Sequence, residues 1–278
     1  MGKRRIDLGG TGTPLQFIHA NAYTPECYNE LLTPLKDKYE VHLYRQRPLW
    51  PGESHEQLSD WTIFADDLIN MMDQHGDSKV IGIGHSLGGI ATWLASIKRP
   101  DLFSQVILID PVVLPYWISV MSSLAPIALM SKMNPIIKIA KNRRTEWKDR
   151  LEARQHLGSK KVFQRFHPAV FDNFLKYGLK EKADGSLTLS YSREWEAQVY
   201  STGPNMWKIM KQNAVPIHII KAQYSDVITA KTWEKLEARV PMASFYEMPN
   251  VGHLIPFEKP LLLAEHIREL LSSTQTSS

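Results

Sequence analysis

Cysteine is almost absent from this chain of 278 residues, which contains only Cys27. A single cysteine cannot form an intrachain disulfide, and it cannot supply the several thiolates of a structural zinc site. A chain of this length can bury a substantial hydrophobic core without either kind of cross-link. We therefore expect a fold that is held together by its core and contains no structural metal.

The start of the sequence also lacks the pattern of a secretory signal peptide, so none is expected. The basic residues Lys3, Arg4 and Arg5 are followed by Asp7 and three glycines, where such a signal has its apolar run. The expected location of the protein is therefore cytoplasmic.

One stretch without charged residues, residues 111–131, is long enough to span a bilayer. It contains Pro115 and Pro126, and a proline interrupts a continuous helix. The segment therefore predicts two short helices, buried or facing a substrate, and no membrane contact is expected from it.

The net charge is small, +4, and it is unevenly distributed. Residues 132–161 hold ten Lys and Arg against Glu146, Asp149 and Glu152, so the rest of the chain is slightly acidic. This distribution excludes a uniformly basic, nucleic-acid-binding protein. The basic segment is typical of a solvated helix face, with an anionic membrane surface or an acidic substrate as the alternatives.

Apolar runs of strand length alternate with longer helical patterns along most of the chain. Several of the runs are continuously apolar, as in strands that are covered on both faces. The alternation predicts an α/β fold with a doubly wound, mostly parallel sheet. The expected strands are 15–19, 41–44, 79–83, 106–109, 217–221 and 244–247, and the expected helices include 24–37, 58–72, 87–98 and 260–271.

The alternation breaks between residues 113 and 212, in a block whose pattern is typical of helical and irregular structure. Strand patterns flank the block on both sides, so it is expected to leave one sheet and return to it as a helical cap. The predicted organisation is a core of residues 1–112 and 213–271, a cap of residues 113–212, and a disordered tail of residues 272–278.

The most informative string is Gly84-His85-Ser86-Leu87-Gly88, which lies between a strand pattern and a helical pattern. A serine on a tight strand-to-helix turn projects its hydroxyl above the sheet, and the turn leaves no room for side chains at the two glycines. The N–H of Leu87 then points toward an oxyanion formed on a substrate. The string predicts Ser86 as a nucleophile, with an ordinary turn as the alternative.

With this motif, the chain resembles the α/β-hydrolase-fold serine hydrolases over nearly its whole length. The chain order of that family is nucleophile, acid and then histidine. Val251-Gly252-His253, which follows the last strand pattern, resembles the family's histidine loop. The resemblance implies that His253 takes and returns the proton of Ser86.

Two aspartates are candidates for the acid. Residues 216–226 resemble the family's strand, turn and aspartate, with Ala222 where glycine is usual. This resemblance implies that Asp226 is the acid, which would fix the tautomer of His253 and stabilise its charged form. Asp110, at the end of another strand pattern, is the alternative, because some relatives take the acid from that position.

A second oxyanion donor is implied by residues 17–22, which resemble the family's oxyanion loop with Ala20 in the place of glycine. By this match the donor is the N–H of Asn21, which acts together with that of Leu87. The alternative is that Asn21 only caps the helix expected over residues 24–37.

Three residues are candidates for substrate binding. Tyr116 and Trp117 supply large apolar surface in the expected cap, and Arg45 lies in a loop after the second strand pattern, where it could meet an anionic substrate tail. A surface ion pair is the alternative for Arg45.

The resemblance implies a cofactor-independent carboxylesterase that cleaves small-molecule esters of small to medium acyl groups through Ser86, His253 and Asp226. A C–C bond hydrolase of the meta-cleavage-product type is the alternative within the enzyme class. A non-catalytic, ligand-binding member of the fold is the alternative from a different class. No metal, cofactor or nucleic acid is expected.

Overall fold

The central feature of the computed structural model, which describes residues 4–119, 134–203 and 205–275, is one large sheet. Within these residues seven strands are ordered β1-β3-β2-β4-β5-β9-β10. β1 runs antiparallel to β3, and the pairings among the other strands are parallel. The strands are β1 (Arg5–Gly9), β2 (Thr13–Ile18), β3 (Tyr39–Tyr44), β4 (Val80–His85), β5 (Phe103–Ile109), β9 (Ile217–Tyr224) and β10 (Ser244–Gly252).

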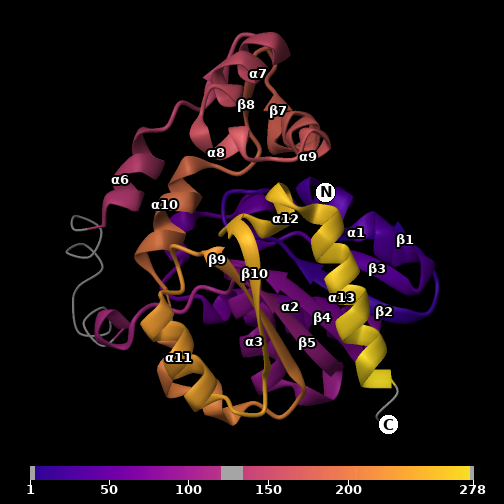
Figure 1. Cartoon of the computed structure of the whole chain (residues 1–278). Coiled ribbons are helices and arrows are strands. Elements are labelled where there is room, and N and C mark those ends of the chain that lie inside the picture. The colour runs from indigo at the N-terminus through magenta and orange to yellow at the C-terminus, as the bar shows by residue number, and fades with distance from the viewer. Residues whose placement is uncertain (1–3, 120–133, 204, 276–278) are drawn as a thin grey trace.

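Helices cover both faces of this sheet (Figure 1). Along β5, Ile107 and Ile109 belong to one buried cluster, whereas Val106 and Leu108 belong to the other, because successive side chains of a strand point to opposite faces. The doubly wound, mostly parallel sheet predicted from the sequence is thereby confirmed. One cluster includes residues of α1 (Asn29–Leu32) and α13 (Pro260–Gln275), and the other includes residues of α2 (Thr62–His75), α3 (Leu87–Lys98) and α11 (Ala230–Arg239).

Each expected strand overlaps a strand of the sheet, but the edge strand β1 was not predicted. The helix expected over residues 24–37 is also divided. It consists of a 3₁₀ turn at Pro25–Tyr28, the short α1, and a second 3₁₀ turn at Thr33–Asp37. The second 3₁₀ turn contains Pro34, and a proline in the interior of a helix lacks the N–H that a continuous helix requires.

The segment between β5 and β9 leaves the sheet and returns to a directly neighbouring strand. Its described part contains helices and also a small antiparallel sheet in the order β6-β8-β7, which the sequence did not predict. Figure 1 shows α7, α8, α9, β7 and β8 together beyond the end toward which β10 points. The elements are α6 (Pro135–Asn142), β6 (Glu146–Trp147), α7 (Arg150–Gly158), α8 (Lys161–Gln164), α9 (Pro168–Asn173), β7 (Leu179–Glu181), β8 (Leu187–Leu189) and α10 (Arg193–Ser201).

The final helix, α13, extends through Gln275, so the expected disorder of residues 272–275 is wrong. Leu263, Ile267 and Leu271 are fully buried at steps of four, and this buried stripe anchors the helix to the sheet. Residues 276–278 of the expected tail lie outside the described residues.

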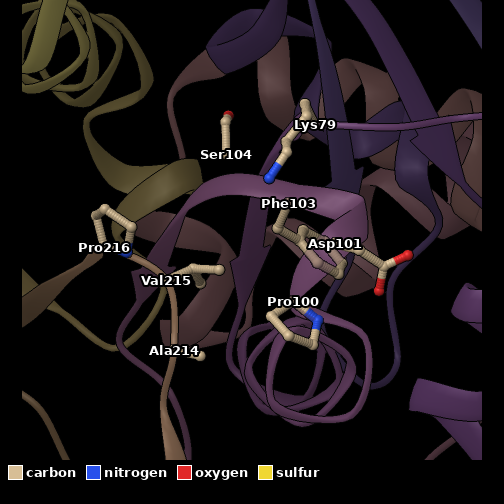
Figure 2. A pocket seen from close by; sticks show the side chains of 8 residues that line it. All are labelled: Lys79, Pro100, Asp101, Phe103, Ser104, Ala214, Val215 and Pro216. Carbon is tan, nitrogen blue, oxygen red and sulfur yellow. The ribbon is translucent and has the colours of Figure 1, made fainter. Parts of the chain in front are cut away.

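A surface hollow of about 420 Å³ lies at the amino ends of β4, β5 and β9 (Figure 2). Residues that precede or begin these strands line it, among them Lys79, Phe103 and Pro216. Ligands of open α/β sheets bind at the opposite edge, outside the carboxyl ends of the strands. The candidate site is therefore found at that opposite edge.

Candidate active site

Ser86 occupies the sharp turn between β4 and α3, as the Gly-x-Ser-x-Gly string predicts. Its backbone has a φ of 55° and a ψ of −116°, a combination that residues with side chains rarely adopt. The Ser86 N–H donates to the carbonyl of Ile109 (2.9 Å), and this bond ties the turn to the end of β5.

Close backbone contacts explain the two glycines of the motif. A Cβ atom on Gly84 would lie 2.2 Å from the carbonyl oxygen of Gly88, and one on Gly88 would lie 2.3 Å from the carbonyl oxygen of Ile18. Both distances are far inside van der Waals contact, so only glycine fits at these positions.

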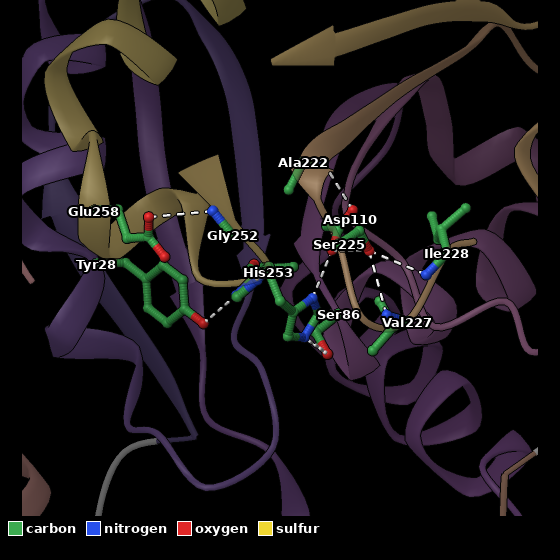
Figure 3. A network of polar contacts seen from close by, with 11 residues as sticks. Tyr28, Ser86, Asp110, Ala222, Ser225, Val227, Ile228, Gly252, His253 and Glu258 are labelled. Atoms are coloured by element: carbon green, nitrogen blue, oxygen red, sulfur yellow. Dashed lines mark hydrogen bonds and ion pairs between the residues drawn. The ribbon is translucent and has the colours of Figure 1, made fainter. Parts of the chain in front are cut away.

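A continuous line of hydrogen bonds joins Ser86, His253 and Asp110 (Figure 3). Nε2 of His253 lies 2.9 Å from Oγ of Ser86, and Nδ1 of His253 lies 2.7 Å from Oδ2 of Asp110. The three residues follow the ends of β4, β10 and β5 and are distant in the sequence. A hydroxyl, an imidazole and a carboxylate in this order have the geometry of a catalytic triad.

The prediction that Asp226 is the hydrogen-bond partner of His253 is wrong in this geometry, because Asp110 occupies that position. Asp226 is exposed and lies two residues beyond the end of β9. The end of β9 and the loop after it instead supply donors to Asp110. Ser225 donates its hydroxyl to Oδ2 of Asp110 (2.8 Å), and Ala222 donates its N–H to Oδ1 (2.9 Å).

Asp110 has no exposed surface, and its backbone adopts a left-handed φ of 38°. A buried carboxylate needs donors for both of its oxygens, and Asp110 receives them from Ala222, Ser225 and His253. Its own N–H donates to the carbonyl of Ile220 (2.6 Å). Asp110 is thus fixed by hydrogen bonds on both its backbone and its side chain.

The imidazole of His253 has a raised pKa. Burial by itself would lower this pKa, but the hydrogen bond from His253 to Asp110 and the charge of Asp110 outweigh burial. The charges of Asp226 and Glu258 raise it further. The pKa of His253 therefore lies above its ordinary value of 6.5, which suits a group that takes and returns a proton near neutral pH.

The two expected oxyanion donors lie on segments that flank Ser86. Leu87 is the first residue of α3, and N–H groups in the first turn of a helix have no partner within the helix. The loop after β2, which carries Asn21, packs against the same turn, since the carbonyl oxygens of Ile18 and His19 closely approach Gly88.

His19 orients the peptide unit that carries the Asn21 N–H. The Gln46 N–H donates to Nε2 of His19 (3.1 Å), so Nδ1 carries the proton and donates to the carbonyl of Ala20 (2.8 Å). Burial lowers the pKa of His19 to about 3, which keeps the ring neutral. Because this carbonyl and the Asn21 N–H share one planar unit, the bond fixes the direction of the N–H.

The Asn21 side chain does not cap the following helical turn, so that alternative is wrong. Its Nδ2 donates to the carbonyl of Glu196 in α10 (3.2 Å). The residue at the N-cap of that turn is Thr24. Asn21 therefore links the loop after β2 to the segment inserted between β5 and β9.

A family model for the alpha/beta hydrolase family matches residues 17–266. The match includes the turn at Ser86, the buried Asp110 and the loop of His253. The chain belongs to the alpha/beta hydrolase family. The resemblance inferred from the motifs is thereby confirmed.

Two curated relatives of this hydrolase align along almost its whole length. The uncharacterized hydrolase YugF of Bacillus subtilis (strain 168) is 20% identical over 265 residues, which cover 91% of this chain and 88% of the relative. The 2-(acetamidomethylene)succinate hydrolase of Mesorhizobium japonicum is 20% identical, with 97% of this chain and 95% of the relative covered.

Among solved structures, the crystal structure of E-2-(acetamidomethylene)succinate hydrolase matches this hydrolase with a TM-score of 0.79. The sequence identity is 18%, and the match covers 97% of this chain and 98% of that chain. At this identity the likeness establishes the shared fold.

Arg45 of this hydrolase lies in an ion pair with Glu26. Its neighbour Arg47 pairs with Asp67 and Glu53. A guanidinium that is already neutralised by a carboxylate has little attraction left for an anionic substrate tail. The prediction that Arg45 binds substrate is therefore not supported by this geometry, and the ion-pair alternative describes it better.

Tyr116 and Trp117 are 54% and 67% exposed. The Tyr116 ring packs edge-on against Trp207, with 6.2 Å between the ring centroids. Contact of either residue with a substrate stays a prediction, because the following residues 120–133 lie outside the described part of the chain.

Several arginines of the basic segment, residues 132–161, are paired with carboxylates of the inserted segment. Arg143 pairs with Glu196, and Arg144 pairs with Glu152. These pairs reduce the excess positive charge at the surface. Across residues 4–119, 134–203 and 205–275, no helix is long and apolar enough to cross a membrane, and no group of three or more His, Cys, Asp or Glu could hold a metal ion.

The sequence analysis missed His85 and Tyr28, which are fully buried beside the triad. The Tyr28 hydroxyl lies 2.8 Å from Nδ1 of His85. The position of His85 next to Ser86 was the only signal available, and no motif marks Tyr28. Ser225 was also missed, because the neighbouring Asp226 was given the role of the acid.

Proposed function

We propose that this hydrolase cleaves carboxylic esters of small to medium acyl groups through Ser86, His253 and Asp110. The observation that carries the proposal is the line of two hydrogen bonds that joins the Ser86 hydroxyl to the buried Asp110 carboxylate through His253. The strained backbone of Ser86 supports it, because such strain is characteristic of functional sites.

The first half of the reaction is attack on the acyl carbonyl. His253 takes the Ser86 proton on Nε2 as the oxygen forms its bond to the carbonyl carbon. Asp110 accepts the Nδ1 proton in a hydrogen bond and stabilises the imidazolium. The N–H groups of Leu87 and Asn21 stabilise the negative oxygen of the tetrahedral intermediate. His253 then donates its proton to the departing alcohol, which leaves the acyl group on Ser86.

The second half releases the acid. A water molecule takes the place of the alcohol and gives a proton to His253 as its oxygen attacks the acyl-enzyme. The intermediate collapses, and the proton returns from His253 to Ser86. No step of this sequence uses a metal or another cofactor.

The inserted segment is the proposed cap over the acyl group. Its helix α10 contacts the site directly through Glu196 and Asn21. The same helix carries the apolar ring of Tyr200, a residue that is 36% exposed. We therefore infer that the acyl chain lies beneath α10.

A second candidate is hydrolysis of an acyl compound that carries carboxylates. The match to 2-(acetamidomethylene)succinate hydrolase along nearly the whole chain favours it, because that relative is named for hydrolysis of a succinate derivative.

We also propose a cytoplasmic location for this hydrolase. The single cysteine, Cys27, supports this location, because it is buried and has no disulfide partner in the chain.

Activity on a panel of p-nitrophenyl esters of increasing acyl length tests the proposal. The panel also includes 2-(acetamidomethylene)succinate and a diketone acid of the meta-cleavage type. Saturable turnover of the shorter esters is the expected result. If only one of the two acids is turned over, that acid and not an ester is the substrate. If the protein binds these compounds without turnover, it is a non-catalytic member of the family.

The raised pKa of His253 predicts the acid limb of the pH profile. His253 acts as a base only when it is neutral, so kcat/KM is expected to fall as the pH drops through a midpoint above 6.5, the ordinary value of the group. The variant Asp226→Asn removes one of the charges that raise this pKa, so its midpoint is expected at lower pH. The measurement is kcat/KM on one ester across the acid range, and a midpoint below 6.5 in the unaltered protein would contradict the prediction.

A further inference from the structure

Both ring nitrogens of His85 are hydrogen-bonded in the interior beside the triad. Nδ1 lies 2.8 Å from the Tyr28 hydroxyl, and Nε2 lies 2.9 Å from the backbone carbonyl oxygen of His253. The Tyr28 hydroxyl in turn lies 3.0 Å from the backbone nitrogen of Ala20. Figure 3 shows Tyr28 on one side of His253 and Asp110 on the other.

The chemistry of the groups fixes the direction of every hydrogen bond in this chain. A carbonyl oxygen can only accept, so Nε2 of His85 carries the proton and donates to His253. Nδ1 of the neutral ring is then an acceptor, and the Tyr28 hydroxyl donates to it. The Tyr28 oxygen remains free to accept from the Ala20 N–H.

His85 is also held in its neutral form. Burial lowers its pKa well below the ordinary value, and the positive charge of a protonated His253 lowers it further. The two rings are only 5.1 Å apart between centroids. His85 can therefore keep the same pattern of donors and acceptors while His253 gains and loses a proton.

This series of hydrogen bonds ends at two loop segments of the site, the oxyanion loop at Ala20 and the loop of His253. Ala20 directly precedes Asn21, and the bond from the Ala20 N–H to Tyr28 complements the bond from His19 to the Ala20 carbonyl. The peptide units on both sides of Ala20 are thereby fixed. At the other end, His253 follows an irregular stretch of β10, in which Asn250 has a positive φ of 60°.

We propose that Tyr28 and His85 are positioning residues that hold the oxyanion loop and the catalytic histidine in the correct position relative to each other. They touch neither the substrate nor the reacting atoms. They act through the backbone of Ala20, which sets the direction of the Asn21 N–H, and through the backbone of His253, which sets the position of the imidazole between Ser86 and Asp110. The proposal rests on the proposed function.

The variant Tyr28→Phe tests one end of this network. It removes a single oxygen and keeps the ring, which packs against Phe17 and Phe257 at 4.6 and 4.7 Å between centroids. It is expected to lower kcat about 10- to 100-fold with little change in KM, because small misplacements of catalytic groups cost about 100-fold. Tyr44→Phe is the matched control, since the buried Tyr44 hydroxyl has no hydrogen-bond partner among the described residues. This control is expected to keep kcat within about two-fold.

Two variants of His85 test the centre of the network. His85→Leu removes both hydrogen bonds, and it is expected to lower kcat at least as much as Tyr28→Phe. A glutamine offers one acceptor and one donor on a neutral group, so His85→Gln is expected to recover most of that loss. The acid limb of kcat/KM is expected to move to lower pH in His85→Leu, because a loosened His253 loses part of its bond to Asp110.

The rate at which a fluorophosphonate labels Ser86 is measured on the same variants, because it reports the triad without assuming a substrate. Equal kcat and labelling rates in Tyr28→Phe, His85→Leu and Tyr44→Phe would overturn the positioning proposal. The proposal would also be overturned if kcat and the labelling rate of His85→Gln were no higher than those of His85→Leu and if the losses in all variants followed only their melting temperatures. A protein that is labelled at Ser86 but cleaves no ester would instead overturn the proposed function, and the labelling rates would still decide the positioning proposal. A protein that is not labelled at Ser86 would overturn both.

Discussion

Replacing Ser86 with alanine is expected to lower kcat for ester hydrolysis by about 10⁶-fold, the usual effect of removing the nucleophile of a triad. The hydroxyl is the only atom on which the covalent intermediate can form in the proposed mechanism. Its hydrogen bond in the structure is to His253, and the backbone of the turn is fixed by its own contact with Ile109. The fold and the melting temperature are therefore expected to change little.

Labelling with a fluorophosphonate separates this result from a loss of folding. The unaltered protein is expected to carry the label on Ser86, and Ser86→Ala is expected to carry none. Ser104→Ala is a suitable control, because Ser104 lies at the amino end of β5, at the opposite edge of the sheet. Label on a different serine, or residual activity in Ser86→Ala close to that of the control, would show that Ser86 is not the nucleophile.

The second large effect is expected from Asp110→Asn, which should lower kcat by about 10⁴-fold. The carboxylate oxygen accepts the proton on Nδ1 of His253 and so keeps Nε2 free to accept from Ser86. An asparagine that turns its amide nitrogen toward His253 favours the opposite tautomer, and the base is then lost. The Ala222 N–H can still donate to the remaining oxygen, and the Ser225 hydroxyl, which faces the position of the new amide nitrogen, can accept from it, so the variant is expected to fold.

Asp226→Asn is the matched comparison for this variant, because both residues follow adjacent strands and both charges act on His253. Its kcat at neutral pH is expected to stay within a few-fold of the unaltered protein, because its exposed side chain makes no direct contact that the mechanism uses. The kcat of both variants on one ester decides between the two aspartates. A large loss in Asp226→Asn together with a small loss in Asp110→Asn would make Asp226 the acid.

The sequence predicts the positions of Ser86 and His253 better than the carboxylate that lies beside His253, for a physical reason. Ser86 lies in a turn whose glycines leave a visible pattern, and His253 follows the last strand. Asp110 and Asp226 both follow apolar strands whose carboxyl ends are neighbours in the sheet, so either could reach His253. The choice depends on the direction of two side chains. The left-handed backbone of Asp110 and the hydrogen bond from the Ser225 hydroxyl to its carboxylate decide that direction, and neither leaves a pattern in the sequence.

The fold shows the same division between patterned and unpatterned segments. Continuously apolar strands such as β4 and β5 are evident from composition, because they are buried on both faces. The edge strand β1 contains Arg5, Asp7 and Gly9 and is only partly buried, so its sequence resembles a loop. The small sheet of the inserted segment was missed because its strands have two or three residues, too few for a period to be seen.

The segment between β5 and β9 begins and ends on strands that are hydrogen-bonded to each other, with Ile109 paired to Ile220. A segment of this kind is a loop whose two ends are held at a fixed, short separation. The entropy of closing such a loop grows only with the logarithm of its length, so doubling its length costs roughly 0.6 kcal/mol. The joint can therefore accept insertions of very different size without a large loss of stability. Evolution can exchange the segment that we propose as the cap while the sheet that carries Ser86, Asp110 and His253 stays the same.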